Sequence, residues 1–216
     1  MSSVTWRDPS GRTLADYPHP SIAVDVALLT VREDRLCVLL HEKHDGLWYL
    51  PGRFVRIDET LREAALLALR EKVGVTGQEP EQLHVFDALD RDSRGRVITV
   101  AHVDLVPAKL LGTAIGEPAP VAELPQLAFD HREIVDKAVE RVRAEYRERP
   151  DPRRLLSERF TLFELQRVHE AVLGERLQKD TFRRRMLPGL QETDTVQRGS
   201  VGKPARLFRR HPPANG

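Results

Sequence analysis

Runs of apolar residues mark two adjacent strands in the first quarter of the chain. Residues 22–31 (IAVDVALLTV) and 35–40 (RLCVLL) are mostly apolar and β-branched, a pattern typical of buried strands, with Asp25 intruding into the first run. Glu33 and Asp34 fit a tight turn between the two runs. Further strands are predicted over residues 48–50, 84–89 and 97–106.

Residues that favour turns separate these strands. Pro51-Gly52 is expected to end the third strand, and Arg94-Gly95 to form a hairpin turn between the last two. The glycine- and proline-rich stretch 112–120 (GTAIGEPAP) predicts a loop.

Two strong helix patterns alternate with the strands. Residues 60–72 (TLREAALLALREK) are good helix formers, with Thr60 and Glu63 placed as a capping box and Gly74 as a C-cap. Residues 132–147 carry an apolar stripe at helical spacing and predict an amphipathic helix.

The segment 148–152 (ERPDP) is expected to end that helix, because proline lacks a backbone donor and restricts the residue before it. We therefore predict two domains, residues 1–149 and 150–216. In the second domain, helix-like segments are expected at 155–159, 162–173 and 178–187, followed by two short strands within 190–210.

The two predicted domains differ in charge. Residues 1–150 carry 20 Lys and Arg against 25 Asp and Glu, whereas residues 151–216 carry 14 against 8. Such a split indicates modules with different partners and favours nucleic-acid contact by the basic one. The alternative is an uneven but merely solvated surface.

Composition narrows the class of protein further. With 40% hydrophobic and 31% charged residues among 216, the chain has a globular composition rather than a disordered or fibrous one. No apolar run approaches the roughly 18 residues of a membrane helix, and the first residues lack the pattern of a secretory signal. The single cysteine, Cys37, excludes an intrachain disulfide, and a cytoplasmic location is expected.

Residues 50–75 (LPGRFVRIDETLREAALLALREKVGV) resemble the Nudix box, whose pattern is G, five residues, E, seven residues and REUxEExGU, with U a bulky aliphatic residue. Glu59, Gly74 and Val75 set the register. In the box, glutamates at helical spacing converge on one helix face, where they hold Mg²⁺ to bridge a pyrophosphate and activate water.

This chain departs from that pattern at the residues that carry the chemistry. Arg53 replaces the box glycine, Leu67 the arginine, Ala68 the first glutamate of the helix and Lys72 the last. Of the three glutamates on that helix face, Glu71 alone remains. One carboxylate beside an ammonium does not provide the oxygen ligands that Mg²⁺ prefers. We therefore expect no metal, no cofactor and no hydrolysis. The eight histidines and Cys37 likewise show no spacing typical of zinc or of a nucleophile.

Loss of hydrolysis is compatible with retained binding. One hypothesis is that Lys72 and Arg53 supply positive charge to an anionic ligand in place of the metal, with arginines of the segment 90–96 (DRDSRGR) at the rim. The alternative is that these are solvated surface charges. The candidate ligand-binding residues are Lys43, Arg53, Glu59, Glu71, Lys72, Arg91 and Arg96.

The second domain has the layout of a helix-turn-helix with a basic hairpin. A helix over 162–173 is followed by the short link 174–177 and a second helix with three successive arginines, which suits entry into a major groove. Between residues 183 and 210 there are eight basic and two acidic residues. The alternative is a charged helical bundle with no DNA contact. The candidate DNA-binding residues are Gln178, Lys179, Thr181, Arg183, Arg184, Lys203 and Arg206, and Arg209-Arg210 are expected to face phosphates.

The combination is more specific than either part. A degenerate Nudix box followed by FTLFELQRVHEAVLG, KDTFRRRML and GKPARLFRR, together with LAFDH at 127–131 and RDSRGRV at 91–97, resembles the NrtR family of Nudix-related transcriptional regulators of NAD metabolism. The resemblance covers nearly the whole chain. It implies an α+β fold: an N-terminal Nudix-like α/β/α sandwich and a C-terminal winged helix-turn-helix.

The same resemblance implies a function. Family members are bacterial repressors, usually homodimers, that bind double-stranded DNA at an inverted-repeat operator and control NAD synthesis or salvage genes. Their Nudix domain senses ADP-ribose or a related nucleotide. Two other hypotheses remain open: a Mg²⁺-dependent ADP-ribose or nucleoside-diphosphate hydrolase with a basic appendage, and a metabolite-binding protein that contacts RNA or protein through its basic tail.

Overall fold

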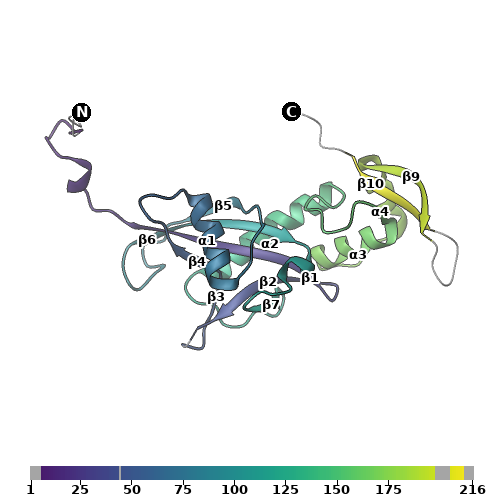
Figure 1. The fold of residues 1–216 in the computed structure, drawn as a ribbon, viewed down its shortest axis with the longest axis horizontal. Helices are drawn as coiled ribbons and strands as arrows, with labels where there is room; N and C mark the ends of the chain where they lie inside the picture. The colour runs from purple at the N-terminus through teal and green to yellow at the C-terminus, as the bar shows by residue number, and fades with distance from the viewer. Residues whose placement is uncertain (1–5, 44, 198–204, 212–216) are drawn as a thin grey trace.

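The structure is a computed structural model that describes residues 6–43, 45–197 and 205–211. A sandwich of helices and sheet occupies the middle of the molecule, and a smaller module of helices and a hairpin lies at one end (Figure 1). Residues 6–20, with a short 3-10 helix at Leu14–Asp16, lead away from the sandwich at the other end.

Seven strands form the sheet of the sandwich. Their order is β3-β2-β1-β6-β5, with β4 paired to β1 and β7 paired to β2. β1 and β2 form the predicted hairpin, in which Glu33 and Asp34 have φ values of 51° and 59°, as a two-residue turn between twisted strands requires. The strands are β1 Ser21–Arg32, β2 Arg35–Glu42, β3 Trp48–Tyr49, β4 Gly52–Phe54, β5 Glu81–Phe86, β6 Val97–Val106 and β7 Glu117–Pro120.

One helix covers each face of the sheet (Figure 1). α1 (Leu61–Val73) packs on one face and α2 (His131–Glu148) on the other, each above its own apolar core. The predicted caps of α1 are confirmed: Thr60 and Glu63 form a capping box, and Gly74 has φ 69°. Because these caps satisfy backbone groups locally, they define the helix independently of its packing.

The second module follows the proline-rich segment after α2. It contains α3 (Leu162–Leu173), α4 (Lys179–Met186) and a three-stranded sheet in the order β8-β10-β9. Thr161 and Glu164 cap α3, and Gly174 ends it. Its strands are β8 Phe160–Thr161, β9 Leu190–Gln197 and β10 Ala205–Arg210, and short 3-10 helices span Ala108–Leu111 and Leu187–Gly189. Its core is made of Phe160, Leu165, Phe182, Met186, Leu190 and Phe208.

The third strand ends before Pro51-Gly52, as predicted, and a separate strand, β4, begins at Gly52. Three local predictions were wrong. Residues 117–120 form a strand rather than a loop. The strand predicted at 84–89 lies instead at 81–86. Its predicted hairpin with β6 is confirmed, and residues 87–96 connect the two strands. Residues 155–159 are not helical, because the amides of Leu155 and Leu156 donate to the Asp151 carboxylate.

The two modules share a hydrogen-bonded junction. Asp151 is fully buried and accepts from the Tyr146 hydroxyl at the end of α2, while its backbone amide donates to Nε2 of His169 on α3 at 3.3 Å. Val172 and Leu173 of α3 also belong to the core beneath α2. The orientation of α3 is therefore tied to the sandwich through both polar and apolar contacts.

Among the described residues no helix has the length and apolar character needed to cross a membrane.

Candidate functional site

A pocket of about 270 Å³ opens in the sandwich between the β1–β4 pair, the C-terminal turn of α1 and the start of α2. Four of the seven residues predicted to bind a ligand line it: Lys43, Arg53, Lys72 and Arg91. They come from four separate parts of the chain. The fold therefore brings together basic groups that the sequence only suggested were related.

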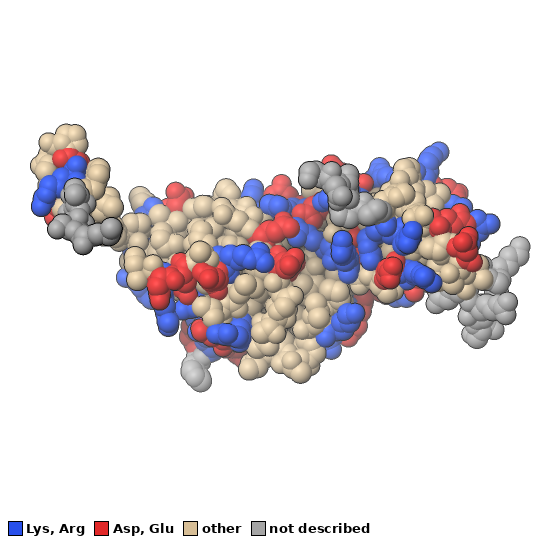
Figure 2. All heavy atoms as spheres, turned by 45° about the horizontal axis from the view of Figure 1, so that its top comes forward, with Lys and Arg blue, Asp and Glu red and all other residues tan. Residues whose placement is uncertain are grey.

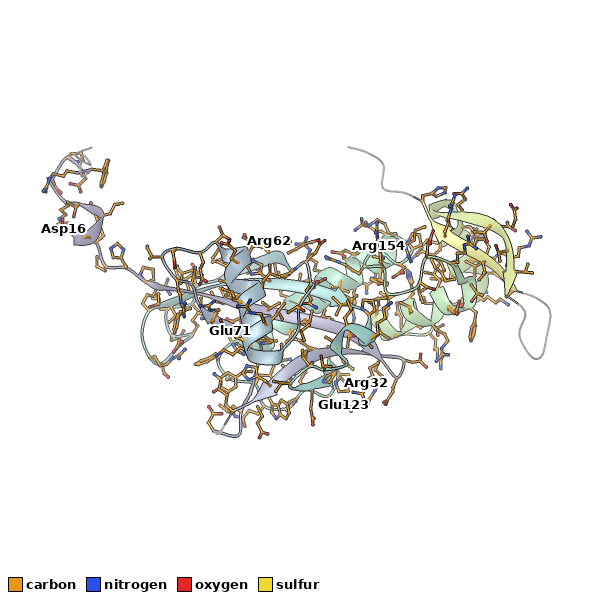
Figure 3. All side chains as sticks on the ribbon, in the orientation of Figure 1. Asp16, Arg32, Arg62, Glu71, Glu123 and Arg154 are labelled. Atoms are coloured by element: carbon orange, nitrogen blue, oxygen red, sulfur yellow. The ribbon has the colours of Figure 1, made fainter. Side chains whose placement is uncertain are left out.

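The other three predicted residues do not line this pocket. Glu59 is turned toward Arg53, and Glu71 is exposed on α1 (Figure 3). The guanidinium of Arg96 donates to the carbonyl of Asp87 at 2.6 Å on the outside of the loop. Arg94, two residues earlier, lines the pocket in its place.

Arg53, at the position of the box glycine, forms an internal ion pair. Its Nη1 lies 3.2 Å from Oε2 of Glu59, and both side chains are 9% exposed. The other carboxylate oxygen of Glu59 accepts the amide of Arg56 at 2.8 Å. Glu59, a glutamate position of the box, therefore holds an arginine, and the charge of that arginine is balanced inside the protein.

A buried network of charged and polar side chains forms the floor of the pocket. Arg91 makes two hydrogen bonds with the Asp130 carboxylate, at 2.6 and 2.7 Å, and lies 3.7 Å from Asp25. Nδ1 of His131 accepts the Leu50 amide, and Nε2 of the same ring faces Oδ1 of Asp25 at 3.4 Å. Burial acts to raise the pKa of Asp25, but the contacts with His131 and Arg91 outweigh it and lower the pKa.

This network was missed at the level of sequence. The available signals were Asp25 inside an apolar strand and the LAFDH segment, which supplies Asp130 and His131. The same network depends on Gly52: a Cβ there would lie 2.1 Å from Oδ1 of Asp25.

Aromatic rings form one side of the pocket. The Arg94 guanidinium is paired with Asp92, at 2.7 and 2.9 Å, and lies 5.3 Å from the ring centre of Phe54 and 5.1 Å from that of Phe129. The Tyr49 ring meets Phe129 edge to face. Exposed aromatic faces and a guanidinium plane offer stacking surfaces to a planar group such as a nucleobase.

Two lysines give the pocket its uncompensated positive charge. Nζ of Lys43 lies 3.7 Å from the ring centre of Tyr49, and Lys72 lines the same pocket from α1. Within the described part of the chain, neither has a carboxylate within 4 Å. Burial, followed by the charges of Lys72 and Arg94, lowers the pKa of Lys43, and burial together with Lys43 and Lys72 lowers the pKa of His41. The pocket therefore suits an anionic ligand.

The residues of the box do not fit a Mg²⁺ ion. No cluster of three His, Cys, Asp or Glu side chains that could hold a metal occurs among residues 6–43, 45–197 and 205–211. Ala68 is fully buried and offers no ligand oxygen, and Lys72 lines the pocket where the box has its last glutamate.

A second surface of interest lies on α4 and the β9–β10 hairpin. Basic side chains are numerous over this end of the molecule, with a few carboxylates among them (Figure 2). On α4, Phe182 and Met186 are buried, whereas the polar residues face solvent. Four exposed cations have no carboxylate within 4 Å among the described residues: Lys179, Arg183, Arg184 and Arg185.

The predicted contact residues of α4 and its N-cap are all exposed. Gln178 is the N-cap and accepts the Thr181 amide at 2.6 Å, and Thr181 itself is exposed. Since each helical residue advances about 100°, Arg184 lies opposite the buried pair Phe182 and Met186. Arg184 is therefore the arginine that points most directly away from the module.

The hairpin only partly matches the predicted wing. Arg206 is ion-paired with Glu192 across β9 and β10, and Lys203 lies outside the described residues. Arg210 was expected to face phosphates, and that expectation was wrong. Its guanidinium turns inward to the buried Asp151 carboxylate and to the Ser157 carbonyl, which fixes the hairpin to the junction between the modules.

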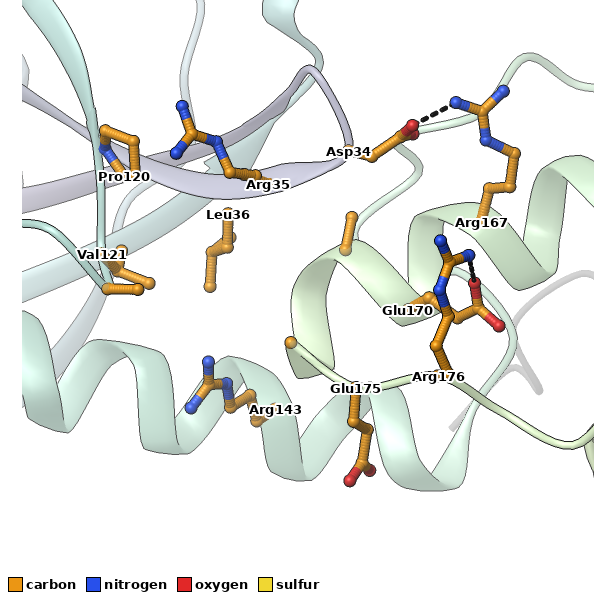
Figure 4. Close-up of a pocket in the computed structure, with 13 residues that line it drawn as sticks. Asp34, Arg35, Leu36, Pro120, Val121, Arg143, Arg167, Glu170, Glu175 and Arg176 are labelled. Carbon is orange, nitrogen blue, oxygen red and sulfur yellow. Dashed lines mark hydrogen bonds and ion pairs between the residues drawn. The ribbon is translucent and has the colours of Figure 1, made fainter.

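A second pocket, of about 360 Å³, separates the sandwich from α3 (Figure 4). Arg167 of α3 is ion-paired across it with Asp34 at the β1–β2 turn, and Arg176 is paired with Glu170 at 3.0 Å. On the opposite side, Nε of Arg143 on α2 donates to the Val172 carbonyl at 3.1 Å. The two modules are therefore in direct contact around this pocket.

Comparison with known proteins matches two family descriptions to this chain. Residues 19–149 match the NUDIX domain, and residues 152–210 match the NrtR DNA-binding winged helix domain. The ADPR responsive transcriptional repressor NtrR of Acinetobacter baylyi is 34% identical over 209 residues, which cover 90% of this chain and 84% of that protein.

Solved structures give the same result. The crystal structure of Shewanella oneidensis NrtR complexed with a 27mer DNA is 35% identical, with a TM-score of 0.71, over 88% of this chain and 93% of that one. The NUDIX domain of the same protein complexed with ADP ribose is 30% identical, with a TM-score of 0.52, over 61% of this chain and 94% of that domain.

Proposed function

Since the chain belongs to the NrtR family of Nudix-domain transcriptional repressors, we propose that it binds operator DNA through its winged helix and ADP-ribose, or a related NAD-derived nucleotide, in its Nudix pocket. By its resemblance to the family, the regulated genes serve NAD synthesis or salvage, and the protein acts in the cytoplasm. We place the boundary between the two domains at residues 149 and 150.

The observation that carries this proposal is the pairing of two unlike sites in one chain. The Nudix pocket offers two uncompensated ammonium groups and aromatic faces, but no carboxylate cluster for a metal among the described residues. The exposed face of α4 offers four cations that have no carboxylate partner in the described part of the chain, over the buried Phe182 and Met186. The first set of groups matches a nucleotide, and the second matches a phosphate backbone.

Binding to an inverted-repeat operator calls for a homodimer, in which two α4 helices contact half-sites spaced by one turn of the duplex or a multiple of it. Gln178, Lys179, Thr181, Arg183 and Arg184 are proposed to lie at the DNA, with Lys203 and Arg206 on the hairpin. Lys43, Arg53, Lys72 and Arg91 are proposed to lie at the nucleotide, to which the structure adds Arg94.

Hydrolysis is not part of the proposed function. A Nudix hydrolase needs converged carboxylates to hold the metal that activates water. Ala68 and Lys72 stand in place of two of them, and Glu71 does not line the pocket. The hydrolase alternative predicts Mg²⁺-dependent release of AMP from ADP-ribose, which incubation with product separation measures directly.

The proposed function is tested by selecting bound sequences from random duplexes, followed by footprinting and competition with ADP-ribose and NAD. Recovery of a palindromic sequence whose binding responds to ADP-ribose is expected. A double variant, Lys179→Ala with Arg184→Ala, should lose the duplex and keep the nucleotide. Absence of any selected sequence, or AMP release by the wild type, would overturn the proposal.

A further inference from the structure

The cations of the Nudix pocket fall into two classes. Each guanidinium is paired with a carboxylate: Arg53 with Glu59, Arg91 with Asp130 and Arg94 with Asp92. The two ammonium groups, on Lys43 and Lys72, have no carboxylate within 4 Å in the part of the chain that the structure describes. Asp25 also lines the pocket, where it is shared by Arg91 and His131. Lys43 and Lys72 are therefore the pocket cations that stand outside these ion pairs.

The two lysines reach the pocket from different elements. Lys43 follows the end of β2, with its ammonium held over the Tyr49 ring, and Lys72 lies in the last turn of α1. Two like charges that face one half-buried space repel each other, and the repulsion is relieved when an anion lies between them. Burial, followed by the charges of Lys72 and Arg94, lowers the pKa of Lys43; burial, followed by the charges of both lysines, lowers the pKa of His41.

Lys72 lies at a position that binds metal in the Nudix box. In the register set by Glu59, Gly74 and Val75, Lys72 occupies the place of a glutamate of the Nudix box. The box uses that carboxylate to hold a divalent cation, which in turn holds a pyrophosphate. A lysine at the same place supplies a positive charge without the metal.

We propose that the ammonium groups of Lys43 and Lys72 replace the divalent cation of the Nudix site and bind the diphosphate of a nucleoside diphosphate ligand directly. The inference rests on the proposed function, because it concerns the same pocket. It explains how this chain could keep nucleotide binding without hydrolysing the nucleotide. An ammonium attracts phosphate oxygens as a metal does, but it has no coordination position at which water is bound and deprotonated.

The test is a titration of the full-length protein with ADP-ribose, followed by calorimetry, in EDTA and in excess Mg²⁺. The wild type should bind with the same Kd, within twofold, in both. Lys72→Ala and Lys43→Ala should each weaken binding by roughly 10–100-fold, as expected for loss of one hydrogen bond to a charged group. Lys72→Arg should retain most of the affinity because it retains the charge.

The matched control is Arg70→Ala, which removes an exposed cation from the same helix at a position that does not line the pocket. Its Kd should equal that of the wild type. Mg²⁺-dependent binding by the wild type, or equal affinities for Lys72→Ala and Arg70→Ala, would overturn the inference.

Titration with ADP separates this inference from the proposed effector. Metal-independent binding of ADP that is lost in Lys72→Ala, without binding of ADP-ribose, would support the role of the lysines and refute ADP-ribose as the ligand. If neither nucleotide binds the wild type, both the inference and the proposed nucleotide site are refuted.

Discussion

Arg167 of α3 is ion-paired with Asp34 at the β1–β2 turn, so that a residue of the DNA-binding module is joined to a turn of the Nudix sheet. The pair lies on the pocket between the modules, and the side chains are 51% and 59% exposed. An exposed pair contributes little to stability, about 0–1 kcal/mol. Its position suits it instead to bias the relative orientation of the two modules.

Replacement of Arg167 should therefore reduce the coupling between the two sites more than it reduces the affinity of either site for its own ligand. For Arg167→Ala we expect the Kd for DNA and the Kd for ADP-ribose, each measured singly, to stay within about twofold. The factor by which ADP-ribose changes DNA affinity should become smaller, because the contact between the two modules is lost. Coupling free energies of this kind are typically about 1–3 kcal/mol. Arg32→Ala is the control, because Arg32 pairs with Glu33 on the same turn. Undiminished coupling would contradict this role.

Arg53 and Glu59 should matter for stability. Because both side chains are 9% exposed, Arg53→Ala leaves a nearly buried carboxylate without its partner. We expect a loss of roughly 2–4 kcal/mol in the free energy of unfolding, measured in urea. Arg35→Ala removes a partner of Glu123 from a pair that is 50% and 70% exposed, and should cost less than about 1 kcal/mol. Equal losses in the two variants would show that the Arg53 pair is not protected from solvent.

Arg184 should contribute to sequence recognition. It lies opposite the buried Phe182 and Met186 and has no carboxylate partner among the described residues. If it contacts a base edge, Arg184→Ala should cost about 1–3 kcal/mol and relax specificity at one operator position, whereas loss of a phosphate contact weakens all sequences alike. Binding to the selected operator and to scrambled duplexes distinguishes these outcomes. Affinity unchanged for every duplex would remove α4 from the interface.

His169 should make stability depend on pH. Burial lowers the pKa of this histidine in the folded protein from 6.5 to about 4. As pH falls below 6.5 the unfolded chain takes up a proton that the folded protein does not, so stability falls until about pH 4. Between pH 7 and pH 5 the loss from this residue is about 2 kcal/mol.

The variant His169→Gln isolates this contribution. Glutamine can accept the Asp151 amide in place of Nε2, but it does not titrate. The free energy of unfolding should therefore fall less between pH 7 and pH 5 in the variant than in the wild type. Parallel pH profiles would mean that the ring takes up its proton over the same pH range in the folded and unfolded protein.

Features determined by neighbouring residues could be predicted from the sequence. The capping boxes at Thr60 and Thr161, the glycine ends of α1 and α3, and the β1–β2 turn all satisfy backbone groups within a few residues. The apolar stripes then define which face of each helix is buried. For this reason the helices and most strands were predicted within a few residues.

Features determined by distant partners could not be predicted. β7 is a strand only because Glu117–Pro120 pairs with β2, some eighty residues earlier, and its prolines argued for a loop. Arg210 turns inward because it pairs with the buried carboxylate of Asp151, which lies 59 residues earlier in the sequence. Arg94 rather than Arg96 lines the pocket because of how one loop folds back. The sequence shows which side chains are charged, but only the folded structure shows where each of them points.

The central claim is that nucleotide and DNA bind at separate sites of one protein and influence each other. The direct measurement is a pair of titrations: operator DNA with and without saturating ADP-ribose, and ADP-ribose with and without saturating operator. Thermodynamic linkage requires the same factor, different from one, in both. That result is predicted. The account would be contradicted if operator left the Kd for the nucleotide unchanged and the nucleotide left the Kd for operator unchanged.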